Sequence, residues 1–148
     1  MKIKIRPAND KDIEKVFKIE QECFKKETMQ SLKHSFCVES FKYFVAEVEN
    51  EIVGFIAINL LCDEAEILSV AVSLNFRKIG VATELFKFVF NFLLSRNVSK
   101  VFLEVSVKNE PAIKLYNFLG FEEISRRKNY YRFSNGKSED AIIMKKSL

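Results

Sequence analysis

A basic turn with one glycine, Arg-Lys-Ile-Gly-Val-Ala at 77–82, stands between an expected strand at 66–72 and an expected amphipathic helix at 81–95. The first N–H groups of a helix lack intrahelical partners and the helix dipole makes that end electropositive, so this turn can bind a pyrophosphate. Neither the dinucleotide signature nor the P-loop signature is present. Taken without its surroundings, the pair Arg77 and Lys78 is more typical of a solvated turn.

A carboxylate and a tyrosine further along the chain have side chains that can transfer protons. Glu104 interrupts the apolar strand expected at 100–106, and apolar surroundings disfavour the charged form of a carboxylate, which suits a general base. Tyr116 lies in the next expected helix, which starts near Asn109. Structural roles also fit these residues: a glutamate paired at a sheet edge, a tyrosine packed in the core, and an asparagine N-cap.

Three segments resemble the GNAT superfamily of N-acetyltransferases. The turn fits Gln/Arg-x-x-Gly-x-Gly/Ala, and residues 109–121 fit Asn-x-x-Ala-x-x-Leu-Tyr-x-x-x-Gly-Phe. The segment Arg-Arg-Lys-Asn-Tyr-Tyr at 126–131 is similar to RimI-type ribosomal-protein-alanine N-acetyltransferases, and that narrower resemblance covers residues 62–146. The resemblance implies acetyl-CoA (coenzyme A) as cofactor and direct transfer, in a ternary complex, to the N-terminal α-amine of a protein.

The same resemblance implies roles for individual residues. Glu104 is the implied general base, and Tyr116 is the implied acid for the departing thiolate. Deprotonation through water to Glu66 or Glu104 stays open as an alternative route. Tyr130 and Tyr131 are implied to line the groove for the acceptor peptide. The implied cofactor-binding residues are Val70, Ala71, Val72, Arg77, Lys78, Ile79, Gly80, Val81, Ala82, Thr83 and Asn109.

The acceptor is the part of the prediction that the residues constrain least. RimI-type chains commonly carry a Phe-Pro-Trp or related segment between the first helices, where this chain has Cys-Phe-Lys-Lys-Glu at 23–27. At pH 7 about one α-amine in ten is neutral, against about one lysine in 2,500, so a protein N-terminus asks less of the base. A ribosomal protein is one candidate partner. A small-molecule amine acceptor and a non-catalytic acyl-CoA sensor stay open as alternatives.

Hydrophobic spacing predicts the elements that position these groups. The expected order, β-α-α-β-β-β-α-β-α-β-β over a single domain 1–148, gives an α/β or α+β fold, with a mixed sheet and helices on both faces, as the GNAT fold requires. The expected strands are 2–6, 41–48, 52–60, 65–72, 100–106, 121–133 and 141–146. The expected helices are 10–24, 28–38, 81–95 and 111–119.

Composition argues against several other classes of protein. The net charge of +4 comes from 24 basic and 20 acidic residues that alternate along the chain, so nucleic-acid binding is not indicated. Three cysteines without paired spacing argue against a disulfide-built domain, and the single histidine, His34, makes no metal site. The N-terminus lacks a signal-peptide core and no stretch suits a bilayer span, so we expect a cytoplasmic protein without membrane contact.

Overall fold

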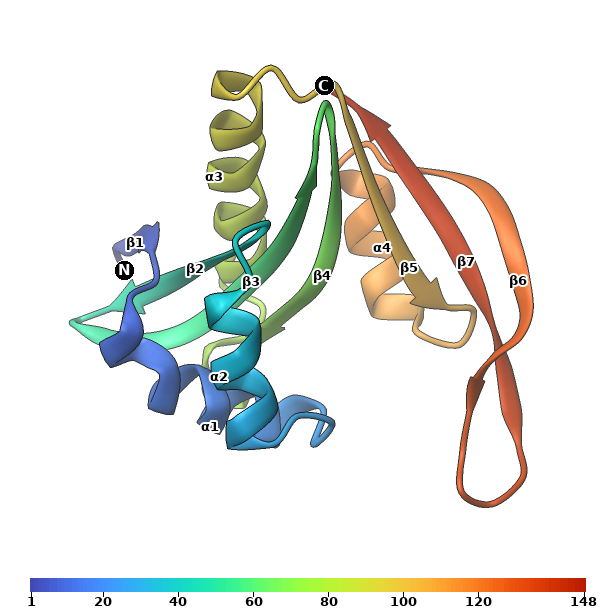
Figure 1. Ribbon diagram of the computed structural model, residues 1–148, viewed down its shortest axis with the longest axis horizontal. Helices are drawn as coiled ribbons and strands as arrows, with labels where there is room; N and C mark the ends of the chain where they lie inside the picture. The colour runs from blue at the N-terminus through green and yellow to red at the C-terminus, as the bar shows by residue number, and fades with distance from the viewer.

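The computed structural model describes residues 1–148 and shows a seven-stranded mixed sheet with helices on both faces (Figure 1). The strand order is β1-β2-β3-β4-β5-β7-β6, and only β4 and β5 pair in parallel. The strands are β1 (Ile3–Pro7), β2 (Phe41–Val48), β3 (Glu51–Leu61), β4 (Glu64–Val72), β5 (Lys100–Ser106), β6 (Glu122–Arg132) and β7 (Ser138–Ser147). The helices are α1 (Ile13–Cys23), α2 (Met29–Cys37), α3 (Val81–Ser95) and α4 (Glu110–Phe118), with short 3-10 turns η1 (Asp10–Asp12) and η2 (Leu74–Phe76). The expected fold class and element order are therefore confirmed.

Two hydrophobic clusters lie on opposite faces of the sheet. In β2, Phe44 packs in the larger cluster with α3 and α4, whereas the next residue, Val45, packs in the smaller cluster with α1 and α2. This alternation follows from the two-residue period of a strand. In α3, Phe86 is fully buried against Tyr116 of α4 and Phe121. Each face of the sheet is thus covered by its own set of helices.

The sheet divides between β4 and β5. Their parallel pairing covers only Glu64–Glu66 against Lys100–Phe102, after which the two strands separate (Figure 1). A register shift at Ala57 and Ile58 of β3, opposite Leu68, disturbs β4 just beyond the last of these pairs. The main chain of β4 from Ile67 onward therefore has no strand partner on the side that faces β5.

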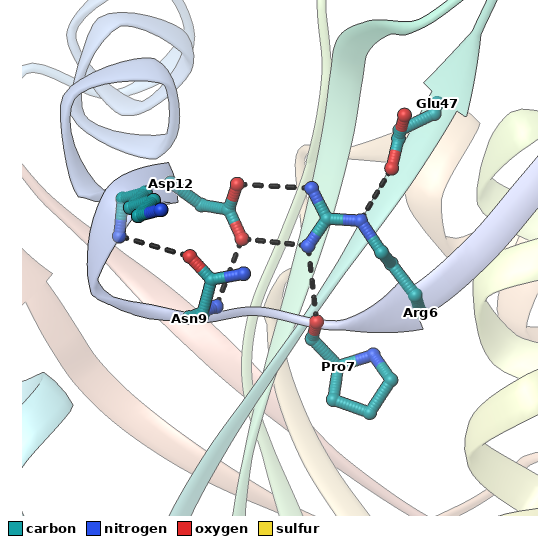
Figure 2. Close-up of polar contacts among 6 residues, drawn as sticks. Arg6, Pro7, Asn9, Asp12 and Glu47 are labelled. Carbon is teal, nitrogen blue, oxygen red and sulfur yellow. Dashed lines mark hydrogen bonds and ion pairs between the residues drawn. The ribbon is translucent and has the colours of Figure 1, made fainter.

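The start of α1 is held to the edge of the sheet by a charged cluster (Figure 2). Arg6 of β1 donates two hydrogen bonds to the Asp12 carboxylate, at 2.7 and 2.9 Å, and its Nε pairs with Glu47 of β2. The same Asp12 carboxylate accepts the N–H of Asn9 at 2.8 Å. Asp12 is buried, so the bidentate pair compensates its charge and aligns the helix that follows.

The single histidine and the three cysteines form no metal cluster and no disulfide. His34 is exposed in the last turn of α2, and the three cysteines, Cys23, Cys37 and Cys62, are free. The structure contains no helix with the length and apolar character needed to cross a membrane.

Candidate active site

The basic turn leads into α3 and leaves three main-chain donors free. Gly80 has φ of 95° and supplies no capping side chain, and the first helical hydrogen bond is Glu84 N–H to the Gly80 carbonyl at 3.0 Å. The N–H groups of Val81, Ala82 and Thr83 have no hydrogen-bond partner. A Cβ built on Gly80 meets nothing within 4 Å, so space is open in front of these amides. Free amides at a helix start with open space before them fit a pyrophosphate.

The two basic residues of the turn have different surroundings. Arg77 donates from Nε to the Val72 carbonyl at 3.0 Å and from a terminal nitrogen to Cys23 Sγ at 3.3 Å. Its guanidinium thus ties the turn to β4 and α1. Lys78, at φ of 64°, and Ile79 are exposed, and Lys78 makes no ion pair. Lys78 is therefore the cation of the turn that is free to meet a phosphate.

The pairing of β4 with β3 decides which main-chain groups of β4 are free. Ser73 N–H donates to the Val53 carbonyl at 2.8 Å, and in an antiparallel ladder only alternate residues share bonds with the partner strand. Ala71 therefore bonds to β3, and its side chain is buried in the smaller cluster. Val70 and Val72 direct their N–H groups toward the space between β4 and β5, where an extended ligand can pair with them.

Two carboxylates lie on one face of the sheet where the strands part. Glu66 of β4 is the register partner of Phe102, and Glu104 follows on the same face of β5. Burial, and then the charge of Glu104, raise the pKa of Glu66 above its usual value, which shows that the two groups interact. The Glu104 side chain is 28% exposed and pairs with Arg127 of β6 at 3.0 Å. A basic acceptor group can reach this pair from solvent.

Tyr116 is buried in α4 on the other face of the sheet. Its ring packs edge-on against Phe86 and Phe121, with centroids 5.8 and 6.0 Å away. Burial raises the pKa of Tyr116 to about 12, with a smaller contribution from Tyr131, so the hydroxyl stays protonated at neutral pH. The hydroxyl has no hydrogen-bond partner in the protein. Asn59 Oδ1 is the only fully buried side-chain polar atom without a partner, so the unpartnered Tyr116 hydroxyl is not fully buried. The Tyr116 hydroxyl is therefore accessible and has a proton to donate.

Asn109 caps the helix that carries Tyr116. Its Oδ1 accepts the N–H of Ala112 at 3.3 Å, while its side-chain NH₂ group makes no hydrogen bond in the protein. The N-cap role is thus present, and the NH₂ group remains free for a ligand.

Of the two tyrosines of β6, Tyr131 lies near Glu104 and Tyr130 lies against Arg127. Burial and the charge of Glu104 raise the pKa of Tyr131, so its hydroxyl lies near that carboxylate. Tyr130 is exposed, and the Arg127 guanidinium lies 3.9 Å from the centre of its ring. A bulge between Arg127 and Tyr131 in the pairing of β6 with β7 sets this arrangement. The periodicity of the sequence does not reveal that bulge.

A buried glutamate that the sequence analysis does not single out organises the loop between α1 and α2. Glu20 accepts the N–H groups of Lys26 and Glu27, at 2.9 and 3.0 Å. The loop places Lys26 Nζ 5.7 Å from the centre of the Tyr131 ring. Glu20 falls on the apolar face of α1, between Ile19 and Cys23, and a charge on that face is the signal that predicts a paired, structural carboxylate.

Comparison with known proteins identifies the family of the chain. The model of the acetyltransferase (GNAT) family matches residues 13–121. A [ribosomal protein bS18]-alanine N-acetyltransferase of Haemophilus ducreyi is 38% identical over 96 residues, covering 65% of this chain and 66% of that protein. An N-alpha-acetyltransferase of Sulfurisphaera tokodaii is 31% identical over 95% of this chain and 90% of its own length.

Among solved structures, the crystal structure of the ribosomal-protein-S18-alanine N-acetyltransferase from Escherichia coli superposes with a TM-score of 0.91. It is 28% identical in sequence, and the match covers 99% of this chain and 94% of that one. The separated strands, the free helix-start amides and the accessible tyrosine therefore belong to a fold that is shared over nearly the whole chain.

Proposed function

The chain belongs to the acetyltransferase (GNAT) family, and we propose that it transfers the acetyl group to the N-terminal α-amine of a protein. Enzymes of this family use acetyl-CoA, which supplies the acetyl thioester when bound. The observation that supports the proposal is the separation of β4 and β5 after Glu66, next to the two interacting carboxylates Glu66 and Glu104. The names of the two sequence relatives, both N-terminal or alanine N-acetyltransferases, support the choice of acceptor.

Three groups of residues hold the donor in this proposal. The free amides of Val81, Ala82 and Thr83, together with Lys78, bind the pyrophosphate. The N–H groups of Val70 and Val72 pair with the pantetheine arm, and the NH₂ group of Asn109 adds a donor. The free N–H groups of β4 would stabilise the charge that develops on the oxygen of a bound thioester.

Glu104 takes the proton of the acceptor amine. Its carboxylate is partly exposed, and a basic group at that place already makes an ion pair with it, namely Arg127 at 3.0 Å. An α-ammonium can occupy the same surroundings, and its reference pKa of about 7.7 to 8.0 lets it lose a proton near neutral pH. Glu66, whose pKa the charge of Glu104 helps to raise, offers an alternative route for the proton through water. A pair of interacting carboxylates binds its first proton more tightly than its second, because the first proton removes the repulsion between the two charges.

Tyr116 returns a proton to the leaving sulfur. Because burial keeps its pKa near 12, the hydroxyl is fully protonated at the pH of the reaction. Its ring is fixed between Phe86 and Phe121, so the hydroxyl has a defined position. Direct transfer needs no covalent acyl-enzyme, and Cys23, the cysteine nearest this region, has its sulfur bonded to Arg77.

The test is incubation with acetyl-CoA and a mixture of peptides beginning with Ala, Ser or Met, followed by mass spectrometry. We expect acetylation at the N-terminal amine, with a ribosomal-protein N-terminus among the peptides that are modified. Glu104→Gln and Tyr116→Phe should each lower kcat by about 10²- to 10⁴-fold with little change in acetyl-CoA affinity. The matched controls, Glu123→Gln from the exposed Glu123–Arg126 pair and Tyr43→Phe, should retain activity.

Two results would contradict the proposal. Acetylation of a polyamine or another small amine with no modified peptide would make the acceptor a small molecule. Tight coenzyme A binding with no acetylated product of any kind would identify a non-catalytic acyl-CoA sensor.

A further inference from the structure

The loop between α1 and α2 has a defined conformation because a buried carboxylate binds its main chain. Glu20 is 3% exposed, and one of its carboxylate oxygens accepts the N–H groups of both Lys26 and Glu27. Gln21 adds a bond from Nε2 to the Glu27 carbonyl at 2.7 Å. Three hydrogen bonds therefore set the place from which the Lys26 side chain extends.

The Lys26 ammonium lies over an aromatic ring and has no carboxylate partner. Its Nζ is 5.7 Å from the centre of the Tyr131 ring, and it makes no ion pair. The neighbouring Glu27 interacts with Tyr43, whose pKa its charge helps to raise. The two carboxylates nearest Tyr131 have partners of their own: Glu104 pairs with Arg127 at 3.0 Å, and Glu139 accepts the Ser106 hydroxyl at 2.8 Å.

Tyr131 lies within reach of both Lys26 and the base. Its ring lies under the Lys26 ammonium, and the charge of Glu104 helps to raise the pKa of its hydroxyl. A peptide in extended form advances about 3.3 to 3.6 Å per residue. An acceptor with its α-amine at Glu104 therefore passes Tyr131 with its second or third residue, and the side chains of those residues can meet Lys26.

We propose that Lys26 recognises an acidic side chain that directly follows the N-terminal residue of the acceptor, so that the preferred substrates are protein N-termini continuing with Asp or Glu. This inference rests on the proposed transfer to an α-amine. The polarity of the acceptor side then alternates: Glu66 and Glu104 receive the ammonium, and Lys26 receives the carboxylate one step further along the peptide. Opposite charges placed in this order select the direction and the composition of the peptide.

The experiment compares two peptides that begin Ala-Glu-Glu and Ala-Lys-Lys and are otherwise identical. We expect kcat/KM to be about twofold to fivefold higher for the acidic peptide at low salt, the size of an exposed ion pair. Lys26→Glu should reverse the order of the two peptides, and Lys26→Gln should make them equal. Lys33→Glu, the same charge change at an exposed position of α2, should keep the wild-type order. High salt should reduce the preference of the wild type.

Each result decides the matter. Reversal by Lys26→Glu and not by Lys33→Glu supports the inference. Equal rates with the two peptides, or a preference for the basic one, overturn the inference while the proposed function stands. A wild-type preference that survives in Lys26→Glu overturns the role of Lys26. If neither peptide is acetylated, the inference falls together with the proposed function.

Discussion

Replacement of Glu20 by alanine tests whether one buried carboxylate organises the loop between α1 and α2, residues 24–28, which is called the acceptor loop after its proposed role. In the wild type this side chain accepts the N–H groups of Lys26 and Glu27, at 2.9 and 3.0 Å, and an amide proton of Gln21 at 2.7 Å. The carboxylate lies at the C-terminal end of α1, where the helix dipole disfavours a negative charge. The loop amides must therefore compensate that charge.

The structure allows an estimate of the loss. A hydrogen bond to a charged group contributes about 1.5 to 3 kcal/mol, so the two main-chain bonds represent roughly 3 to 6 kcal/mol. Water reaches the main chain near Lys26, which is exposed, and replaces part of that. We expect Glu20→Ala to lower the free energy of unfolding by about 2 to 4 kcal/mol. Glu20→Gln, which keeps one acceptor oxygen, should lose about half as much, roughly 1 to 2 kcal/mol.

Urea unfolding followed by circular dichroism gives the free energy, with an unchanged slope if the variants remain two-state. Kinetics should show a rise of about threefold to tenfold in KM for the acceptor peptide, because the loop no longer holds Lys26 in place. KM for acetyl-CoA should change little, since the proposed donor site lies at the start of α3. Glu14→Ala, an exposed glutamate of the same helix, is the control and should stay within about 0.5 kcal/mol of wild type.

The reasoning is refuted if Glu20→Ala loses less than about 1 kcal/mol, because the hydrogen bonds then contribute no more than an exposed contact. It is refuted as well if the KM values for acceptor and acetyl-CoA rise by the same factor. In that case Glu20 supports the fold in general and has no particular effect on the acceptor loop.

Three further predictions follow from the described contacts. Arg6 lowers the pKa of Asp12, so the stability from this pair is present above the pKa of Asp12 in the unfolded chain and is lost as the pH falls below it. Asp12→Asn should be less stable than the wild type at pH 7. Its free energy of unfolding, measured with urea, should fall less between pH 7 and pH 3 than that of the wild type. Burial raises the pKa of Tyr116 to about 12, so the stability that its neutral hydroxyl contributes is present below about pH 10 and is lost as the pH rises toward 12. Between pH 10 and 12, Tyr116→Phe should lose less stability than the wild type, by up to about 3 kcal/mol. An equal alkaline decline in both proteins would contradict the burial of this hydroxyl. Gly80 has φ of 95°, so Gly80→Val should strain the turn by about 1 to 2 kcal/mol. Calorimetry should show that the variant binds acetyl-CoA at least about tenfold more weakly than the wild type. Equal affinity of the two proteins would mean that the pyrophosphate binds elsewhere.

The hydrophobic pattern predicts a helix or strand well where the same spacing of apolar residues continues through the whole element. The expected helix at 81–95 and strand at 100–106 agree with α3 and β5 at both ends. The last strand is longer than its apolar run, Ser138–Ser147 against 141–146, because β7 pairs with β5 on one side and β6 on the other. Pairing with neighbours extends a strand into polar residues, and a single sequence carries no signal for that extension.

The direction of individual side chains is harder to predict than the position of the element that carries them. Arg77 belongs to the signature turn, yet its guanidinium bonds to Val72 and Cys23. Glu104 lies in an apolar strand, yet it pairs with Arg127 across two strand-to-strand contacts. The contacts of Arg77 with Cys23 and of Glu104 with Arg127 join segments far apart in the chain, and local spacing does not encode them.

The amino-acid sequence by itself determined the order of helices and strands, the glycine at the start of α3, and the presence of Glu104 and Tyr116, whose side chains can transfer protons. These features depend on near neighbours, because capping, alternation and backbone freedom act within a few residues. Only the tertiary structure decided that β4 and β5 part after Glu66, that Glu66 and Glu104 interact, and that Lys26 lies over Tyr131. Those contacts join segments distant in the chain, and packing of the whole sheet and its helices sets them.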